Sequence, residues 1–345
     1  MALFYALSFL SGFFETGSLM MGLTSLFTRA AAPEATQVVT STIIRALACA
    51  LCYQIGNLVP RPLELPKSVV IASGLLGAFC FTFVLLPLPP ATVLAASLLG
   101  TVSVSACIQS ARSVMKSGAP KMLKRGARIA GFALGFFCTP NLIMAATVLT
   151  VLFAFIVLRR VPAIKARFIL PRVNGLNIVM VFHQMHYFVY CYAALIVAFE
   201  RGGKAAAIFA FLLSWIVYLL SPLLYRKVKD LRKVFFFGHS LLVLILTGLY
   251  LAPSLPLKIV LYLLTGIGGT TEFCIGGLGK NWGIYNEDAQ NFSENLGHAL
   301  GVASCLILFI ICGDLKISSL FAAVFVLAAI ACMAKMAVAI NKEDL

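Results

Sequence analysis

The sequence predicts an all-α membrane protein with twelve transmembrane helices in two pseudo-symmetric six-helix halves. Hydrophobic residues make up 61% of the 345 residues and charged residues only 11%, and the mean hydropathy is +1.00. A soluble protein of this length could not bury so many apolar side chains, so the chain needs a bilayer as its solvent. In addition, Lys and Arg gather in every second gap between long apolar runs, as in the cytoplasmic loops of multi-pass membrane proteins.

Twelve apolar runs are each close to the ~20 residues that a helix needs to cross the hydrocarbon layer. They lie at approximately 4–27, 38–58, 68–86, 91–111, 123–138, 140–158, 175–199, 204–224, 233–252, 256–278, 293–312 and 317–337. One bent helix over 123–158 is the alternative to the fifth and sixth runs. It is disfavoured because it would place the basic groups at 121–128 and 159–172 on opposite sides of the membrane.

The distribution of cations predicts the orientation of the chain. With both termini in the cytoplasm, the cytoplasmic side holds 21 of the 27 Lys and Arg and the outside holds five, while Arg45 is left within a span. The opposite orientation would reverse this bias. We therefore expect an integral, multi-pass protein of a bacterial inner membrane, acting as a monomer. The net charge of +15 then reflects topology and contact with anionic lipid headgroups, and no nucleic-acid partner is expected.

The long polar gap at 159–174 predicts the division of the chain. It separates an N-terminal six-helix bundle at 1–158 from a C-terminal six-helix bundle at 175–345, and it forms a cytoplasmic linker between them. Two inward-going spans of the two halves also carry similar sequences at similar depth, Leu98-Leu99-Gly100-Thr101 and Leu263-Leu264-Thr265-Gly266. Parallel repeats of six helices, related by an axis along the membrane normal, are one of the known transporter architectures.

Two segments carry a resemblance to a known family. The turn after the second span reads Gly56-Asn-Leu-Val-Pro-Arg61, and the fifth span reads Arg125-Gly126-Ala-Arg128-Ile-Ala-Gly131-Phe-Ala-Leu-Gly135. With its two halves, the chain resembles the major facilitator superfamily over its whole length. The resemblance implies a transporter rather than an enzyme, with Arg61 and the corresponding Arg226 of the second half at the gate. The family's loop Asp and its antiporter Pro are absent, so export is not implied.

Three ionisable residues inside predicted spans are the first functional candidates, because such groups are costly in a bilayer. Glu15 and Glu272 are expected to couple transport to protons. Arg45 is the one cation within a span, and its guanidinium can bind a carboxylate or phosphate with two hydrogen bonds. A structural ion pair between Glu15 and Arg45 is the alternative, and both interpretations can hold together.

Polar side chains also gather in the seventh and eleventh spans. In the seventh, His183, His186 and Tyr190 share one helical face with Tyr187 and Gln184 close by, and we expect these five residues to bind the solute. The histidines can relay protons, bind a carboxylate or contact a chelated metal, but two imidazoles do not make a metal site. Neither a metal site nor a cofactor is expected. In the eleventh span, Asn291, Asn295 and His298 share a face near the inner end and are expected to form a gate.

Together these features predict a secondary transporter that moves a small polar organic solute, anionic or zwitterionic, by alternating access with proton coupling. The partners expected are the solute, protons and membrane lipids. A translocase for lipids or lipid-linked precursors on the same fold is the alternative, which the basic inner face favours. A membrane-embedded enzyme using His183, His186 or His298 is a third possibility. No paired acids, no H-E-x-x-H motif and no sizeable soluble domain support it.

Overall fold

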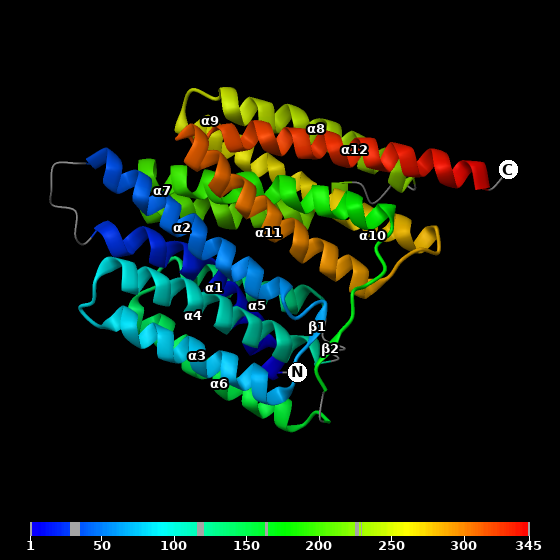
Figure 1. Cartoon of the computed structure of the whole chain (residues 1–345). Helices are drawn as coiled ribbons and strands as arrows, with labels where there is room; N and C mark the ends of the chain where they lie inside the picture. The colour runs from blue at the N-terminus through cyan, green and yellow to red at the C-terminus, as the bar shows by residue number, and fades with distance from the viewer. Residues whose placement is uncertain are drawn as a thin grey trace. The chain divides into compact units, whose positions relative to one another are not determined.

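The computed structural model describes residues 2–27, 35–115, 121–162, 165–224, 228 and 230–343, and these residues are mainly helical. The helices are α1 (Ala2–Phe27), α2 (Ala35–Leu58), α3 (Lys67–Leu85), α4 (Pro90–Ser113), α5 (Lys121–Gly135), α6 (Pro140–Arg159), α7 (Gly175–Leu224), α8 (Leu231–Leu251), α9 (Leu255–Leu264), α10 (Gly268–Asn281), α11 (Glu287–Cys312) and α12 (Ile317–Glu343) (Figure 1). A 3₁₀ turn, η1 (Thr265–Ile267), and two short strands, β1 (Leu63–Glu64) and β2 (Arg167–Phe168), complete the fold.

The chain divides into two compact units, Met1–Leu170 and Pro171–Leu345, which we call unit 1 and unit 2. Seven helical segments among the described residues are long and apolar enough to cross a bilayer. They are α3, α4, α6, α8, α11, the segment Leu255–Asn281 that comprises α9, η1 and α10, and the segment Ile317–Ile340 of α12. The number of twelve spans and the symmetry between the halves stay predictions.

Two helices differ from the predicted spans in how they are built. α7 covers both the seventh and the eighth predicted runs, with a kink at Gly203, whose φ of 68° and ψ of −170° are not helical. A left-handed φ of this kind favours glycine, which has no Cβ to clash with the backbone. The tenth predicted run is divided among α9, η1 and α10. Helix boundaries therefore depend on backbone conformation at single residues as well as on hydropathy.

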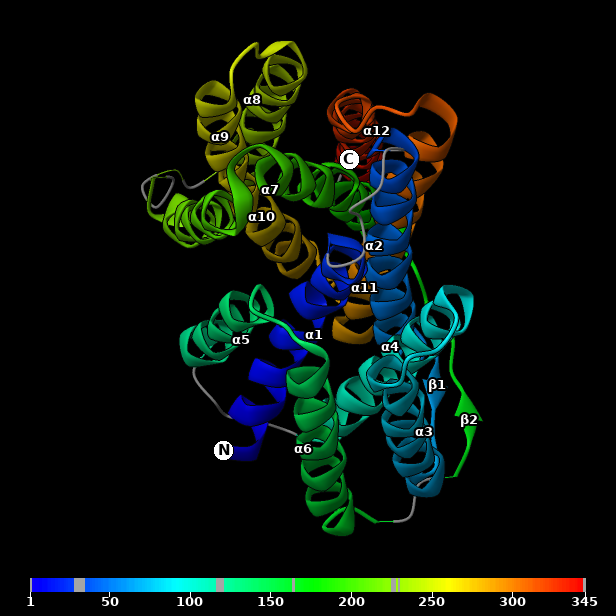
Figure 2. The same ribbon diagram turned by 90° about the vertical axis from the view of Figure 1, so that its left-hand side faces the viewer.

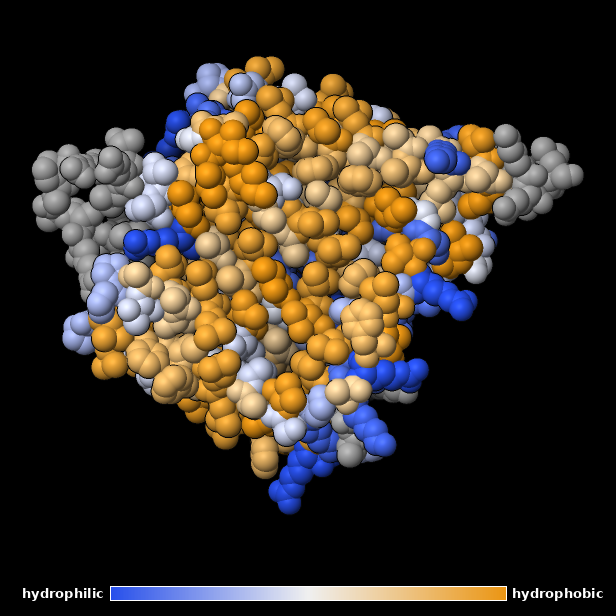
Figure 3. Space-filling view, in the orientation of Figure 1, coloured by the Kyte–Doolittle hydropathy of each residue, from blue (hydrophilic) through white to orange (hydrophobic). Residues whose placement is uncertain are grey.

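Many large apolar side chains face outward. Phe79, Leu244 and Ile311 are 60%, 69% and 73% exposed, and Figure 3 shows apolar side chains over most of the face in view, with hydrophilic ones gathered toward its edges. Such a surface would drive aggregation in water but is well solvated by lipid tails. The outward apolar side chains agree with an integral, multi-pass membrane protein.

In unit 1, α1 packs against α5 on one side and α2 on the other (Figure 2). The backbones of α1 and α5 approach so closely that a Cβ at Gly12 would collide with the carbonyl oxygen of Arg128. A Cβ at Gly131 would likewise collide with the carbonyl oxygen of Phe9. Small residues allow this kind of contact in membranes, where helices associate by close packing rather than by exclusion of water. The two glycines therefore bring the polar side chains of α1 and α5 within reach of each other.

A minimal antiparallel sheet corrects the purely helical prediction for unit 1. β1 follows α2 and β2 follows α6, with Leu63 opposite Phe168 and Glu64 opposite Arg167. The Lys67 amine also donates a hydrogen bond to the carbonyl of Val161. Part of the predicted linker at 159–174 thus pairs with the turn after α2, because extended segments leave backbone groups that need hydrogen-bond partners.

In unit 2, α7 packs against α11, α12, α10 and α9, and α8 packs against α12 and α10. One part of the core joins Val179 and Met180 of α7 to Phe235 of α8, Ile275 of α10 and Met333 of α12. α7 therefore lies at the centre of unit 2, and side chains on several of its faces are buried among other helices.

Candidate functional site

Glu15 of α1 forms an ion pair with Arg128 of α5 inside unit 1. The distance from the Glu15 carboxylate to the Arg128 guanidinium is 2.6 Å, and the two side chains are 7% and 30% exposed. The pair follows from the helix packing, since Glu15 and Arg128 lie beside the contact that Gly12 and Gly131 permit. A carboxylate in such a place needs either a cation or a proton to neutralise it.

Arg112, near the end of α4, adds a second cation to this region. Its Nη1 donates to Ser11 Oγ over 3.1 Å and to Gln109 Oε1 over 3.3 Å, whereas its Nε is buried without a hydrogen bond. The Tyr53 hydroxyl, fully buried, donates to the carbonyl of Ser11 over 2.7 Å. The charged side chains closest to Arg112 are those of Arg61, Arg128 and Glu15.

These residues make up what we call the arginine cluster: Arg61, Arg112, Arg128, Glu15, Tyr53 and Ser11. It contains three guanidinium groups and one carboxylate, so its charge is +2 when all four are ionised. Guanidinium groups with buried N–H donors are suited to binding carboxylate or phosphate oxygens. The arginine cluster therefore has the charge and the donors to hold an anionic group.

The structure corrects the alternative pairing considered for Glu15. Its partner is Arg128 rather than Arg45, and within the described residues Arg45 forms no ion pair. Arg45 lies half-buried on α2, where its backbone packs against Gly22 of α1. Arg45 is therefore not the cation that neutralises Glu15, since Arg128 of α5 occupies that place. Arg226, which was predicted to lie at the gate together with Arg61, is outside the described residues.

Three histidines meet in unit 2, which we call the imidazole cluster: His183, His186 and His239. Their side chains are 3%, 1% and 0% exposed. The ring centroid of His183 lies 4.8 Å from that of His186 and 5.2 Å from that of His239. His186 stacks on Tyr190, with ring centroids 6.3 Å apart, as the shared helical face predicts. No group of three or more His, Cys, Asp or Glu in the described part of the chain is arranged to hold a metal ion.

Hydrogen bonds determine the tautomers of two neutral rings in this cluster. His239 Nδ1 lies 3.0 Å from the carbonyl oxygen of Phe235, which can only accept, so Nδ1 carries the proton. His239 Nε2 is then the acceptor, and His183 Nδ1 donates to it over 3.2 Å. The remaining ring nitrogen of His183 is left as an acceptor. The Nδ1 atom of His186 is buried without a hydrogen bond. The imidazole cluster therefore has ring nitrogens in a buried region that could still form hydrogen bonds.

Glu272 of α10 has a neutral partner. The Tyr218 hydroxyl of α7 donates a hydrogen bond to its carboxylate, and among the described residues Glu272 forms no salt bridge. Glu272 is half-buried rather than buried. A carboxylate held by a hydroxyl is less strongly neutralised than one held by a guanidinium. The two predicted proton-coupling acids thus have different surroundings.

The structure joins one predicted gate residue to a predicted solute-binding residue. His298 Nε2 of α11 donates to Gln184 Oε1 of α7 over 3.1 Å. Asn295 donates to the carbonyl of Asn291 over 2.6 Å, which is a bond within α11. Tyr187 packs edge-on against Tyr190, with centroids 5.7 Å apart.

Arg112, Arg128 and His239 are polar residues of these clusters that sequence reasoning missed. The two arginines were counted among the cytoplasmic cations because they border the basic segment between the fourth and fifth predicted spans. His239 carried a usable signal, since it is an imidazole within the predicted span 233–252, and ionisable groups in spans are functional candidates. The small-residue spacing of α5 hinted at a close helix contact, but not at which residue of α1 it would meet.

Comparison with protein-family models and with curated proteins finds no match for this chain. Solved structures, in contrast, are similar in fold. A bacterial metal transporter is 14% identical with a TM-score of 0.58, covering 97% of this chain and 98% of its own. The human organic anion transporter MFSD10 is 14% identical with a TM-score of 0.59, covering 96% and 99%.

The xylose transporter XylE from E. coli, in a partially occluded inward-open conformation, is 10% identical with a TM-score of 0.60. The alignment covers 96% of this chain and 97% of XylE. Identities this low carry no information on the solute, but the coverage extends over nearly the whole length of each chain. The predicted resemblance is therefore confirmed at the level of fold: this chain shares the fold of these three transporters.

Proposed function

We propose that this chain is a secondary transporter that moves a small anionic or zwitterionic organic solute by alternating access, coupled to protons through Glu15 and Glu272. The single observation that carries the proposal is the arginine cluster, in which Glu15 pairs with Arg128 and Arg112 lies near Arg61, Arg128 and Glu15. The similar structures are transporters of a metal, of organic anions and of xylose. The fold therefore does not identify the solute, and we infer the class of solute from the charge of the arginine cluster instead.

The excess positive charge of the arginine cluster supports an anionic solute. The cluster holds three half-buried cations and one carboxylate, and a bound anion would balance this charge. A carboxylate or phosphate group on a bound solute would supply the negative charge and would use the free Nε of Arg112. The solute then contributes to the stability of the state that binds it, which is what alternating access requires.

The Glu15–Arg128 pair supports proton coupling. When a solute anion approaches Arg128, it competes with the Glu15 carboxylate for the same guanidinium. A displaced carboxylate in a buried place takes up a proton more readily than one that remains paired. Binding of the anion and binding of a proton are thus linked through one arginine, and Glu272 with Tyr218 offers a second carboxylate for the same role.

The polar residues of unit 2 complete the proposal. We assign His183, His186, Gln184, Tyr187 and Tyr190 to the solute path, because the first three are buried polar groups in the centre of the unit and the tyrosines pack beside them. His298, Asn291 and Asn295 are assigned to the gate together with Arg61 and Arg226. Both termini are placed in the cytoplasm on the distribution of Lys and Arg.

The test uses the purified full chain in proteoliposomes with an imposed pH gradient. Uptake of radiolabelled succinate, glutamate, glucose 6-phosphate and xylose is measured at equal concentration. We expect uptake of at least one anion to follow the proton gradient, and xylose to remain at the background of empty liposomes. Arg112→Met should raise the KM for that anion about tenfold or more, since a charged hydrogen bond contributes about 1.5–3 kcal/mol.

Glu15→Gln separates coupling from binding. The variant should lose accumulation driven by the pH gradient but retain exchange of labelled for unlabelled anion, because exchange needs no net proton movement. Glu64→Gln is the matched control, since Glu64 is an exposed carboxylate of β1 in the same unit. Unchanged gradient-driven uptake in Glu15→Gln would refute the coupling, and uptake of xylose in preference to every anion would refute the solute class.

A further inference from the structure

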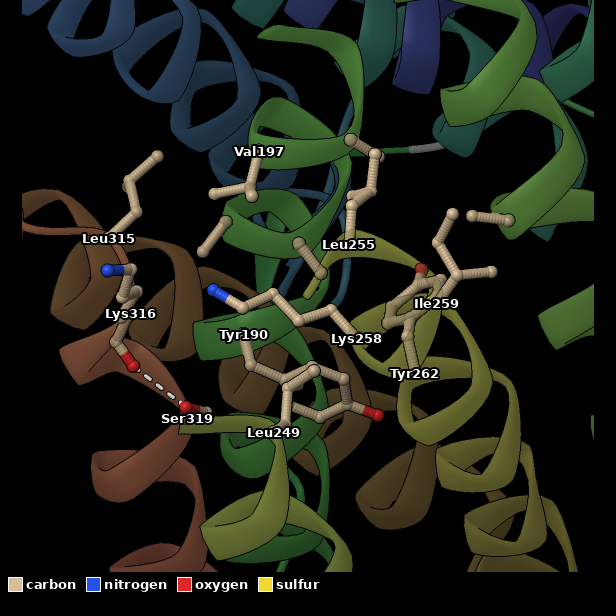
Figure 4. A pocket seen from close by; sticks show the side chains of 14 residues that line it. Tyr190, Val197, Leu249, Leu255, Lys258, Ile259, Tyr262, Leu315, Lys316 and Ser319 are labelled. Atoms are coloured by element: carbon tan, nitrogen blue, oxygen red, sulfur yellow. Dashed lines mark hydrogen bonds between the residues drawn. The ribbon is translucent and has the colours of Figure 1, made fainter. Parts of the chain in front are cut away.

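A pocket in unit 2 lies apart from the arginine cluster and has a different composition. It has a cavity volume of about 50 Å³, and its walls come from α7, α8, α9 and the start of α12 (Figure 4). The rings of Tyr190 and Tyr262 form part of the wall, packed edge to face with centroids 6.2 Å apart. Most other lining side chains are aliphatic, among them Val197, Leu249 and Ile259.

Two lysines line this pocket, and Lys258 is the more buried of them, with only 8% of it exposed. In the part of the chain that the structure describes it forms no salt bridge. Figure 4 shows its side chain running across the pocket with the amine directed into it. The Lys258 side chain is buried and its ammonium has no acidic partner among the described residues, so this position favours an occupant that brings negative charge.

The electrostatic surroundings of Lys258 also favour an anion. The charged groups close to it are Lys316, Arg201 and Asp314, so the region holds three cations and one carboxylate. Lys316 itself lines the pocket, next to Ser319, whose hydroxyl is bonded to the carbonyl of Lys316 over 2.7 Å. The Asp314 carboxylate is exposed and bonded to the backbone N–H of Lys316 over 2.9 Å. One acid does not balance the three cations.

We propose that this pocket binds the carboxylate or phosphate group of a small amphipathic anion, with Lys258 and Lys316 as its charge partners and the aliphatic wall against its apolar part. A cavity of about 50 Å³ is several times the space needed for one water, which suits a single anionic group rather than a whole large solute. The same chemistry is available from a free organic anion and from the headgroup of an anionic lipid. The proposal does not depend on transport, because it concerns binding within unit 2 alone.

The test measures binding to the purified full chain in an uncharged detergent, from the rise of the thermal unfolding midpoint with ligand concentration. Hexyl phosphate and hexanoate are the free anions, and hexanol is their uncharged counterpart. Dioctanoyl phosphatidylglycerol and dioctanoyl phosphatidylcholine represent an anionic and a zwitterionic lipid. We expect saturable stabilisation by hexyl phosphate, hexanoate or phosphatidylglycerol, and little by hexanol or phosphatidylcholine. Stabilisation only by phosphatidylglycerol assigns the pocket to lipid, and stabilisation only by the free anions assigns it to a soluble ligand.

Variants show whether the binding involves this pocket. Lys258→Met should weaken the anion at least ~10-fold, as expected for loss of a charged hydrogen bond, while Lys258→Arg should retain most of the binding. Lys316→Met should weaken it less, and because Lys316 is exposed its loss should not disturb folding. Lys204→Met is the matched control, since it removes an exposed lysine of α7 that does not line the pocket.

A separate measurement checks that the Lys258 variant is folded. Without ligand, Lys258→Met should unfold at the same or a higher temperature than the natural chain, because it removes a buried charge that has no acidic partner. Three results would overturn the proposal. The first is that Lys258→Met and Lys316→Met both bind the anions as tightly as the natural chain. The others are that hexanol stabilises the protein as much as the anions do, or that none of the anions stabilises it.

Discussion

The polar interiors of the two units differ in kind. In unit 1 a buried carboxylate, Glu15, is neutralised by Arg128 within a cluster of three guanidinium groups. In unit 2 the half-buried Glu272 is bonded to the hydroxyl of Tyr218, and the central polar residues are the imidazoles of His183, His186 and His239. One interior is ionic, and the other is held by hydrogen bonds among groups that can be neutral.

The difference bears on the proposed function, because the two interiors respond differently to added charge. An ionic cluster with surplus positive charge responds strongly to an anion, because each new charge changes several Coulomb interactions at once. A network of hydroxyl and imidazole groups costs less to bury and rearranges by exchanging protons and tautomers. If the proposed function holds, recognition of the anion belongs mainly to unit 1, while unit 2 supplies groups that can accept protons. The predictions below test this contrast, in order of decreasing effect.

Gly131→Ala should have the largest effect, because it breaks the contact on which the ionic interior depends. The added Cβ would meet the backbone carbonyl of Phe9, which cannot move without shifting α1 against α5. We expect a loss of about 3 kcal/mol, at the upper end of overpacking costs. The measurement is the unfolding midpoint in detergent.

Gly126→Ala is the control for this prediction. A Cβ there meets no atom within 4 Å, and alanine favours the helix by about 0.5–1 kcal/mol over glycine. The control should therefore unfold at the same or a slightly higher temperature. Equal midpoints for the two variants would show that α1 and α5 do not pack as described.

Arg128→Met should have the next largest effect, since it leaves the Glu15 carboxylate buried without its ion-pair partner. Breaking a fully buried pair costs about 3–5 kcal/mol, and because the Arg128 side chain is 30% exposed we expect about 2 kcal/mol. The double variant Arg128→Met with Glu15→Gln should recover part of the loss. A double-mutant cycle of unfolding midpoints measures the coupling, and strictly additive effects would argue against the ion pair.

His239→Phe tests the hydrogen-bonded interior of unit 2. It removes the acceptor for His183 and the donor to the carbonyl of Phe235, while keeping an aromatic ring of similar size. We expect a loss of about 1–2 kcal/mol in unfolding. Thr247→Val in the same helix is the control, because its hydroxyl bonds only to the backbone one turn earlier and should cost less than about 0.5 kcal/mol. A larger loss for Thr247→Val would contradict the role given to His239.

Tyr218→Phe should have the smallest effect of the four. It removes the hydroxyl that donates to Glu272, but the half-buried carboxylate can bind water instead. We expect a loss of about 0.5–1 kcal/mol in stability, together with slower proton-driven uptake in proteoliposomes. Tyr250→Phe, at a tyrosine 37% exposed in α8, is the matched control for uptake. Equal uptake by both variants would exclude Tyr218 from the coupling.

Comparison of the predicted and observed sites shows which kinds of residue can be found from a sequence. His183, His186 and Tyr190 were recognised because they recur on one face of one helix, and their rings do lie together. His239 joins them from α8, and no spacing along the chain records a contact between helices. For the same reason Arg45 was preferred as the partner of Glu15, since it lies in the neighbouring span, although Arg128 holds that place.

Lys258 is a second kind of residue whose surroundings could not be predicted from the sequence. Its position at the outer end of the tenth predicted run placed it among the five cations on the outside. In the structure α9 begins before it, and its side chain is buried in a pocket. A lysine has an aliphatic stem that can lie along apolar walls while its amine reaches a polar place. Whether the amine ends in water or in a pocket depends on what the neighbouring helices contribute.

The sequence by itself determined that the chain is a helical, multi-pass membrane protein, because hydropathy and the placement of Lys and Arg act through the bilayer, which is the same for every such chain. The tertiary structure alone decided which polar groups meet. Contacts such as Glu15 with Arg128 depend on how closely two helices approach, and that distance is set by glycines that face each other across the interface. Pairing between helices is a property of the packed structure, and no local pattern along the chain encodes it.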